Sequence, residues 1–432
     1  MYNYKANSET ITDEMLKTIG EKSLDDLYSM IDKKARMSEL TLPEAMSEME
    51  VQRTIKSIAK ENKTDYAYFL GAGAYNRFIP AAISQISSRF EFNTAYTPYQ
   101  PEISQGTLQV IYEFQSMICD LTGMEVCNAS VYDAGNACAE AMLMASRISG
   151  KDKILVSTGI NPEYIEVVKT YAHAGNIEIE LAETKDLKTD ITNISDKLKS
   201  GEYAGFIIQN PNFFGSVEDI DILKDIERNS KTMLIVCSDL MSNAVLMKPG
   251  EYGADIVVGD VQSFGNTLSF GGPYAGFIAA KDKYKRQMPG RIVGRTLDID
   301  GRQAFTLTLQ AREQHIRREK ATSNICSNQG LAILNAVIYL ALMGKKGIQQ
   351  AAYLSAKNAK ILSDELKKKG FNVINKDYFN EFVLEVKNAD LFLKTMKDKG
   401  ILAGVKINDG QILVCTTEMN TEEEIKHYIQ SV

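Results

Sequence analysis

The middle of the chain alternates short apolar runs with longer amphipathic stretches. Five apolar runs have the length and composition of strands buried on both faces of a sheet; they are residues 154–157, 177–181, 205–209, 233–238 and 256–259. Between most of them apolar residues recur at helical spacing, for example over 163–174 and 217–229. This alternation predicts an α/β fold with a mainly parallel sheet and helices on both faces. In such folds a site is expected at the carboxyl ends of the strands.

The start of the chain has a helical pattern and no strand. Ser23 and Asp26 have the spacing of a capping box, with Asp in place of the usual Glu or Gln, and Pro43 suits the first turn of another helix. Because these helices precede every predicted strand, we expect residues 1–65 to form an N-terminal helical arm.

The last part of the chain mixes helices and strands differently. Its pattern predicts a small α/β sandwich, whose segments are residues 349–369, 371–374, 381–386, 389–399, 412–416 and a final helix capped by Thr421 with Glu424. We therefore expect a large domain over residues 66–345 and a small C-terminal α/β domain over residues 346–432.

Composition excludes several classes of protein. The chain has 432 residues, of which 44% are hydrophobic and 24% are charged, as in ordinary soluble domains. A nucleic-acid binder would usually be basic, whereas the net charge here is −7. The most apolar stretch, residues 331–343, is shorter than the roughly 20 residues that a membrane span needs, so we expect a buried helix and no membrane association.

The cysteines and the first residues indicate a cytoplasmic protein without a metal site. The six cysteines and three histidines show no spacing that would hold zinc. Residues 1–13 are polar and lack the apolar core of a secretory signal. We expect reduced, mostly buried thiols in the cytoplasm.

Two loops combine residue types that often line sites. Tyr96 and Tyr99 lie in a stretch of aromatic, amide and turn residues, although a surface loop anchored by two tyrosines would have the same composition. Gly135 and Asn136 lead directly into a run of helix-forming residues, and the free N–H groups of a helix start can hold a phosphate. An ordinary helix start is the alternative.

Asp239 follows the apolar run 233–238. A carboxylate at the end of a parallel strand can hydrogen-bond a protonated ring nitrogen of a cofactor. The alternative is a residue that only caps the next turn or helix.

Residues 281–320 form a basic island in an acidic protein. They carry eleven basic and five acidic residues, a local charge of +6 that leaves −13 on the other 392 residues. Such an island can attract an anionic substrate or an acidic partner. A solvated face with internal salt bridges would have the same composition.

Several stretches together resemble one enzyme family. The densest is 309–326, which reads LQAREQHIRREKATSNIC, and the others are 69–75, 96–106, 135–142, 253–256, 270–276 and 288–291. With them the chain resembles the alpha subunit, or subunit 1, of the split glycine-cleavage P-protein, glycine dehydrogenase (decarboxylating). The resemblance covers nearly the whole chain and is weakest at its two ends.

The resemblance implies a fold, a reaction and an assembly. The fold is fold type I of the pyridoxal-phosphate (PLP) enzymes. The reaction is PLP-dependent decarboxylation of glycine, with transfer of the aminomethyl group to the lipoyl arm of the H-protein and release of carbon dioxide. The assembly is a heterotetramer with two copies each of an alpha and a beta subunit.

The sequence departs from the catalytic pattern of such enzymes. A PLP enzyme of this fold needs a lysine to hold the cofactor, and that position, counted back from the GGP motif at 271–273, falls near Gln262. No lysine occurs between Lys248 and Lys281, and Lys281 follows the next apolar strand, so we expect it on the wrong side of the sheet. A cofactor-bearing histidine expected before the lysine is also missing, since that position reads Asp260-Val261.

We therefore expect PLP on the beta subunit and no catalytic residue in this chain. Gly135, Asn136 and Asp239 are then inherited scaffold. Since sites in fold type I dimers lie at subunit interfaces, other residues would complete the partner's site or receive the acidic H-protein; the candidates are Tyr96, Tyr99, Arg312, His315, Arg317 and Arg318. Two alternatives remain, a self-sufficient PLP enzyme with a lysine elsewhere and a catalytically inactive binding module.

Overall fold

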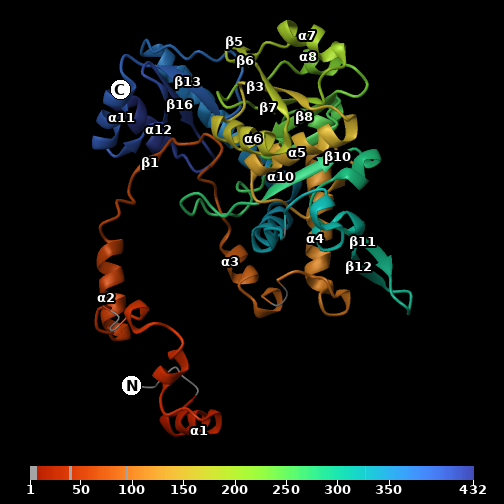
Figure 1. Cartoon of the computed structure of the whole chain (residues 1–432). Helices are drawn as coiled ribbons and strands as arrows, with labels where there is room; N and C mark the ends of the chain where they lie inside the picture. The colour runs from red at the N-terminus through yellow and green to blue at the C-terminus, as the bar shows by residue number, and fades with distance from the viewer. Residues whose placement is uncertain (1–6, 38–40, 94–95, 326) are drawn as a thin grey trace. The chain divides into compact units, whose positions relative to one another are not determined.

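The computed structural model describes the chain except for residues 1–6, 38–40, 94–95 and 326 (Figure 1). It forms two compact units, residues 1–64 and residues 65–432.

The described residues of unit 1 form two α-helices, α1 (Glu9–Ile19) and α2 (Glu48–Ala59). The capping box predicted at Ser23 and Asp26 is confirmed, at the start of a short 3₁₀ helix over Leu24–Tyr28. The prediction that Pro43 opens a helix was wrong. The helix starts five residues later, because Ser47 and Glu50 form a complete capping box in which each side chain accepts the other residue's backbone N–H.

The centre of unit 2 is a seven-stranded sheet in the order β2-β10-β9-β8-β7-β3-β4. Its strands are β2 (Val126–Cys127), β3 (Lys153–Ser157), β4 (Glu178–Ala182), β7 (Gly205–Asn210), β8 (Met233–Ser238), β9 (Ile256–Asp260) and β10 (Gly276–Ala280). The five strands predicted from the apolar runs are confirmed and lie parallel to one another. Only β10 runs antiparallel to its neighbours β9 and β2.

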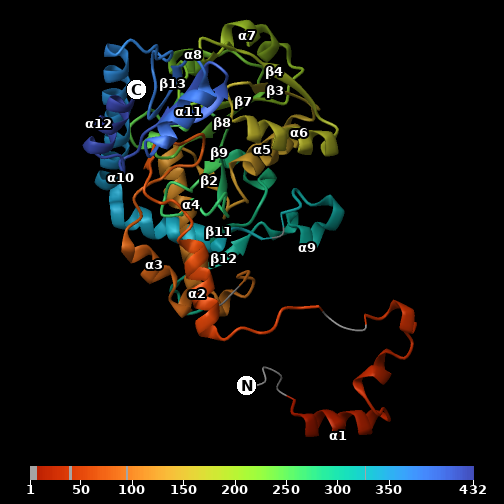
Figure 2. The ribbon, with the colours of Figure 1, turned by 90° about the vertical axis from the view of Figure 1, so that its left-hand side faces the viewer.

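Helices cover both faces of this sheet, as predicted (Figures 1 and 2). Alternate strand residues point to opposite faces. Leu155 and Val236 belong to the core that includes α4 (Gln105–Thr122) and the first half of α10 (Gly330–Lys368). Val156 and Ile235 belong to the core that includes α5 (Ala134–Ser149) and α6 (Pro162–Gly175).

The C-terminal residues build a second, three-stranded antiparallel sheet. Its strands are β13 (Glu381–Glu385), β16 (Gln411–Cys415) and β15 (Val405–Asn408), packed with α11 (Ala389–Asp398), α12 (Glu422–Ser431) and the second half of α10. The capping box at Thr421 and Glu424 is confirmed. The predicted strand 371–374 was wrong, because only Val373 pairs, in a single bridge to Leu384. β1 (Ala67–Tyr68) pairs with β14 (Ile401–Leu402).

The long helix α10 joins the two sheets. The predicted helices 331–343 and 349–369 are its two halves, and Gly344, with φ 58° and ψ −178°, interrupts the helical geometry between them. The predicted domain boundary at 345 therefore falls next to this break. By length and composition α10 can cross a membrane, but Ile333, Ala336 and Tyr339 in its first half are fully buried in the protein core.

Shorter elements complete unit 2. They are α3 (Ala81–Ser87), α7 (Ile191–Ser200), α8 (Ile220–Asp225), α9 (Gln314–Arg317), the hairpin of β5 (Thr184–Lys185) and β6 (Lys188–Thr189), and the hairpin of β11 (Ile292–Leu297) and β12 (Gln303–Thr308). The helix predicted over 217–229 is thus much shorter than its pattern indicated.

Candidate functional site

The carboxyl ends of β8 and β9 border a small cavity of about 40 Å³, called here the strand-end cavity. Asp239 follows β8 and Asp260 ends β9, while Tyr75 and Tyr164 reach the cavity from the loop before α3 and from α6. Sites for drug-sized ligands usually have about 300–1,000 Å³. This chain's own side chains therefore fill the place where a fold of this type would hold a cofactor.

Gln262 lies next to this cavity and is buried. Its side-chain oxygen accepts a hydrogen bond from the backbone N–H of Tyr75 at 2.9 Å, and its amide nitrogen donates to the backbone oxygens of Tyr75 at 3.0 Å and Asn266 at 3.1 Å. Both amide hydrogens are thereby used. The residue at the expected lysine position cannot form an imine and instead holds two loops of the chain together.

Asp239 has the geometry of a turn cap. Its carboxylate accepts the backbone N–H of Met241 at 3.0 Å, and its backbone oxygen accepts the hydroxyl of Ser242 at 2.7 Å. Burial raises the pKa of Asp239, and the nearby Arg77 guanidinium opposes that rise. These contacts fit the alternative given above, in which Asp239 only caps the turn that follows β8.

Gly135 and Asn136 lie in the first turn of α5, as the pattern indicated. Asp133 caps that helix by accepting the backbone N–H of Asn136 at 2.8 Å, and the Asn136 amide donates to the hydroxyl of Tyr171 at 2.9 Å. A Cβ added at Gly135 would lie 3.3 Å from the ring of Tyr164. The helix start therefore packs closely against α6.

Sequence reasoning missed the buried carboxyl groups around the cavity. Burial raises the pKa of Asp260 to about 7, and it raises the pKa of Glu381 to about 7 as well. Glu381 accepts the backbone N–H of Ala72 at 2.7 Å and the hydroxyl of Tyr75 at 2.8 Å. Asp260 could have been found from the sequence, because it lies at the end of the apolar run that forms β9. Glu381 could not, because it comes from the second sheet and nothing in the sequence near it indicates this site.

A buried ion pair lies near these carboxyls. Arg77 contacts Glu418 at 2.8 Å, with side-chain exposures of 2% and 7%. Arg77 also donates to the hydroxyls of Ser263 and Ser355, at 3.2 Å and 3.0 Å. These contacts tie the loop before α3 to α10 and to the C-terminal residues.

Lys281 lies at the opposite edge of the sheet from Gln262, as expected. It follows β10, which is antiparallel to β9, and its ammonium contacts the carboxylate of Asp255 at 2.6 Å. Asp255 precedes β9, whereas the strand-end cavity lies at that strand's other end. Lys281 cannot replace the missing lysine.

The tyrosine-rich loop and the basic island meet at one point of the surface. The Tyr99 hydroxyl accepts a hydrogen bond from Arg291 at 3.0 Å, and the Arg291 guanidinium lies 5.3 Å from the centre of the Tyr99 ring. The ring of His315 packs edge-on against Tyr99, with 5.5 Å between ring centres. We call Tyr99, Arg291 and His315 the tyrosine–histidine cluster.

The other candidates from the sequence lie outside this cluster. Tyr96 is 86% exposed, and its hydroxyl lies 3.1 Å from that of Ser327. Arg312 is buried and donates to the backbone oxygens of Met288 and Gly290, so its guanidinium is committed to this chain's own backbone. Arg317 and Arg318 are exposed.

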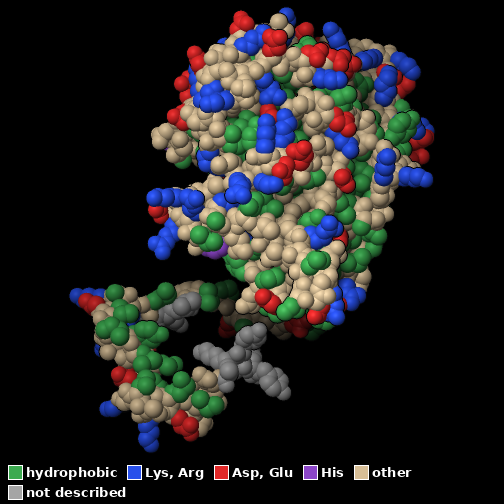
Figure 3. Space-filling model, turned by 90° about the vertical axis from the view of Figure 1, so that its right-hand side faces the viewer, with side chains coloured by type: hydrophobic (Ala, Val, Ile, Leu, Met, Phe, Trp, Pro, Cys, Tyr) green, Lys and Arg blue, Asp and Glu red, His purple; other side chains and the backbone are tan. Residues whose placement is uncertain are grey.

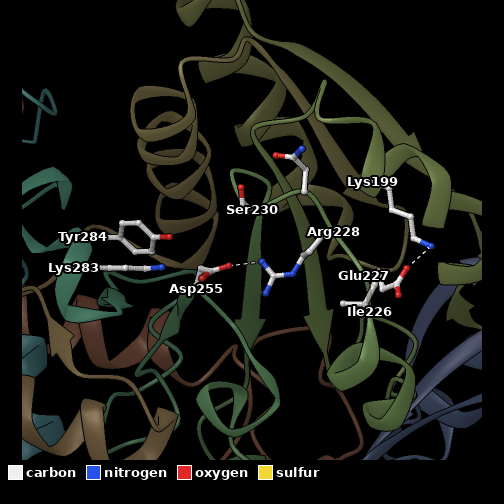
Figure 4. A pocket seen from close by; sticks show the side chains of 9 residues that line it. Lys199, Ile226, Glu227, Arg228, Ser230, Asp255, Lys283 and Tyr284 are labelled. Atoms are coloured by element: carbon white, nitrogen blue, oxygen red, sulfur yellow. Dashed lines mark hydrogen bonds and ion pairs between the residues drawn. The ribbon is translucent and has the colours of Figure 1, made fainter.

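A larger cavity, of about 660 Å³, lies at the end of the sheet that holds Asp255 (Figure 4). Its charges are largely paired, because Arg228 contacts Asp255 and Lys199 contacts Glu227. Figure 3 shows basic and acidic side chains intermixed over the upper part of the face that it presents. Among the described residues, no group of His, Cys, Asp and Glu is placed to hold a metal ion.

The family model of the glycine cleavage system P-protein matches residues 3–432. The chain belongs to this family. It is 44% identical over 442 aligned residues to the probable glycine dehydrogenase (decarboxylating) subunit 1 of Listeria monocytogenes serotype 4b (strain CLIP80459), with 100% of this chain and 98% of the relative covered. It is 42% identical to the protein of the same name from Geobacillus thermodenitrificans (strain NG80-2), with 100% and 99% covered.

Solved structures agree with this membership. A crystal structure of glycine decarboxylase (P-protein) of the glycine cleavage system, in inhibitor-bound form, matches with a TM-score of 0.92 at 36% identity and covers 100% of this chain and 99% of its own. Glutamate decarboxylase of Lactobacillus brevis CGMCC 1306 matches with a TM-score of 0.67 at 12% identity, covering 94% and 97%. The fold is that of the PLP-dependent transferases, as predicted.

PLP itself does not fit the residues of this chain. Gln262 is the residue at the position predicted for the cofactor lysine, and the strand-end cavity is several times smaller than a ligand site.

Proposed function

We propose that this chain is the alpha subunit of a glycine-cleaving P-protein whose beta subunit carries PLP through a lysine. Together the two subunits decarboxylate glycine, transfer the aminomethyl group to the lipoyl arm of the H-protein and release carbon dioxide, as a heterotetramer with two copies of each chain. The observation that carries the proposal is Gln262, whose amide is used entirely to bind backbone. Family membership over residues 3–432 supports the same reaction, and the name subunit 1 of the relatives supports a partner.

Within this assembly we assign the tyrosine–histidine cluster to the partner's active site. Tyr99 is 48% exposed, so a second chain can reach it. Arg291 is buried, and its contacts with Tyr99 together with the packing of His315 hold the Tyr99 hydroxyl and the His315 imidazole in fixed positions before any partner binds. Such a preorganised set can position a carboxylate of the substrate or of the partner.

We further propose that Arg317 and Arg318 receive the H-protein. Both are exposed, and they belong to the island with a local charge of +6. An acidic carrier protein would be attracted to such a surface at long range.

The test is to purify this chain alone and together with the beta subunit. We expect the chain alone to show no visible absorption of a lysine–PLP imine and no exchange of the glycine carboxyl group with carbon dioxide. The two chains together should show both. A PLP–lysine adduct mapped on this chain after borohydride reduction would overturn the proposal in favour of a self-sufficient enzyme, and failure to bind the beta subunit would favour an inactive binding module.

We also propose a cytoplasmic location. The five described cysteines are free thiols, and four of them are buried; Cys326 lies outside the described residues. This usage fits a reducing compartment.

A further inference from the structure

The cavity of about 660 Å³ in Figure 4 lies at the end of the central sheet where β8 and β9 begin and β10 ends. We call it the Arg228 pocket. It is lined by residues 226–230, which lead into β8, by Asp255 before β9, by Lys283 and Tyr284 after β10, and by Lys199 of α7. Its volume is in the range of natural binding sites. The strand-end cavity lies at the opposite end of these strands.

The buried carboxylate of the Arg228 pocket is already fully engaged. Asp255 is 5% exposed. It contacts the guanidinium of Arg228 and, at 2.6 Å, the ammonium of Lys281, and it accepts the backbone N–H of Leu234 at 3.1 Å. Its negative charge is thus shared between two cations and cannot neutralise a third.

Lys283 brings that third cation. Its ammonium lies 4.7 Å from the centre of the Tyr284 ring, and it forms no ion pair with a described residue. Figure 4 shows Lys283 and Tyr284 pointing toward Asp255 from one side of the pocket and Arg228 pointing toward it from the other. Because Arg228, Lys281 and Lys283 face one carboxylate, the pocket has a surplus of two positive charges.

Lys151 extends this positive region. A Cβ added at Gly201 would lie 3.0 Å from the amide nitrogen of Asn229, which lines the pocket, and 3.9 Å from the ammonium of Lys151. Lys151 donates to a backbone oxygen at 3.5 Å and forms no ion pair within the described part of the chain. Burial lowers the pKa of Lys151, and the nearby ammonium of Lys231 lowers it further, as expected where cations gather without anions.

Neutral donors lie beside these charges. The Asn229 side-chain oxygen accepts the backbone N–H of Lys231 at 3.1 Å, whereas its amide nitrogen donates to no described residue. The hydroxyl of Ser230 likewise makes no hydrogen bond with the residues that the structure describes. Both groups can therefore donate to a ligand that brings acceptor oxygens.

We propose that the Arg228 pocket binds a small phosphorylated metabolite. The ammonium of Lys283 contacts the phosphate, and the Asn229 amide and the Ser230 hydroxyl donate to its oxygens. Arg228 holds Asp255 away from the anion. The inference goes beyond the proposed function and does not depend on it.

A phosphate monoester fits this pocket better than other ligands. Its charge of about −1.5 to −2 at pH 7 matches the surplus of two positive charges, and its three oxygens match the three donors Lys283, Asn229 and Ser230. A carboxylate brings a single charge and two oxygens. The remaining volume accommodates an organic group, for which Ile226 and the Tyr284 ring provide apolar surface.

The experiment titrates the full-length chain into glycerol phosphate and follows the phosphorus NMR line width at constant ionic strength, because salt screens exposed charges. We expect the line to broaden as the chain is added. Inorganic phosphate should displace the probe, and acetate at the same concentration should displace much less of it.

Variants locate the binding. Lys283→Gln should weaken binding of glycerol phosphate by about tenfold or more, and Ser230→Ala by about threefold, since each removes a donor to a charged group. The matched control is Lys285→Gln. Lys285 lies in the same 3₁₀ helix, Asp282–Gln287, but its ammonium contacts Asp282 at 2.8 Å, so this variant should bind like the wild type. All three positions are accessible to solvent, so the thermal midpoints should stay close to that of the wild type.

Three results would overturn the inference. The first is a line width that does not change when the wild type is added. The second is equal affinity of the wild type, Lys283→Gln and Lys285→Gln for glycerol phosphate, which would indicate only a general attraction of anions. The third is displacement by acetate as complete as that by inorganic phosphate, which would assign the pocket to carboxylates. None of these results affects the proposed function, which is tested with the beta subunit.

Discussion

At the scale of single residues, Gln262 makes structural contacts at the position where the sequence predicts a cofactor lysine. Gln262→Lys would lose three hydrogen bonds and would bury an ammonium group where the surrounding side chains leave little room for it. We expect the free energy of unfolding to fall by about 3 kcal/mol or more. We also expect no PLP adduct after borohydride reduction, because the strand-end cavity has only about 40 Å³.

Thermal unfolding and peptide mapping of the reduced protein check this expectation. Gln109→Lys is the matched control, because Gln109 is exposed on α4 and lies 2.8 Å from Glu113. It should leave stability nearly unchanged. A stable Gln262→Lys variant with a PLP adduct would show that the cavity can reopen.

Glu381 gives a pH dependence of stability with a definite sign. Burial raises its pKa from the ordinary 4.5 to about 7, so the folded chain binds this proton more tightly than the unfolded chain does. Stability should therefore fall as pH rises from about 4.5 to about 7 and level off above that window. The contribution is at most about 3 kcal/mol at 1.36 kcal/mol per pKa unit.

Urea unfolding across pH 4.5–8 tests this dependence. Glu381→Gln should flatten the profile, because an amide does not titrate in this range. Glu385→Gln, at an exposed position of the same strand, should keep the wild-type profile. Identical profiles for all three proteins would assign the pH dependence to other groups, of which Asp260 is the first candidate.

At the scale of elements, β10 depends on a close approach between backbones. A Cβ added at Gly276 would lie 2.3 Å from the backbone oxygen of Asp133, the residue that caps α5. Gly276→Ala should lower the free energy of unfolding by about 2 kcal/mol or more, because the new Cβ would clash with a backbone atom, which cannot move aside as a flexible side chain can. Gly106→Ala, in open space in the first turn of α4, should raise it by about 0.5–1 kcal/mol. Equal effects in urea unfolding would contradict this reading.

The elements that the sequence predicted well are those with a strong local signal. All five apolar runs became parallel strands, because burial on both faces demands continuous apolar residues. The helix over 217–229 was predicted too long, since Ile226 leaves the helical region and the Asn229 N–H bonds to the backbone of Leu198. Tertiary contacts set the end of this helix, and the hydrophobic periodicity of the sequence does not reveal such contacts.

The site was predictable only in part for the same reason. The count from the GGP motif placed Gln262 at the lysine position, and the apolar run 233–238 placed Asp239 at a strand end. The closure of the cavity by Tyr75 and Tyr164, and the contact of Glu381 with the Tyr75 hydroxyl, were not predictable, because these side chains come from the loop before α3, from α6 and from the second sheet. These residues are brought together only by the fold, so no spacing in the sequence indicates that they meet.

At the scale of the whole molecule, the basic island keeps exposed cations that a partner can reach. Arg312 is buried, and the exposed Lys and Arg side chains of residues 309–326 are Arg317, Arg318 and Lys320. The double change Arg317→Gln with Arg318→Gln should weaken association with the H-protein by about 2- to 30-fold at low ionic strength, at 0.2–1 kcal/mol per exposed pair. It should also reduce the salt dependence of that association.

Binding measured at several salt concentrations decides this point. Arg302→Gln is the control, because Arg302 belongs to the same island but lies on the β11–β12 hairpin, next to Asp300. It should have a much smaller effect. An affinity for the H-protein that is equal in all proteins and at all salt concentrations would remove Arg317 and Arg318 from the docking surface.

Because its strand-end cavity is filled, we expect this chain to respond differently from a PLP-binding partner when the supply of vitamin B6 changes. A ligand stabilises a protein only if the folded state binds it. Tyr75 and Tyr164 already occupy that space in this chain, so we expect its folding and its cellular lifetime to be independent of vitamin B6, the precursor of PLP. A partner subunit that holds PLP through a lysine would depend on that vitamin for its stability. In cells that lack the vitamin, we therefore expect this chain to accumulate without its partner.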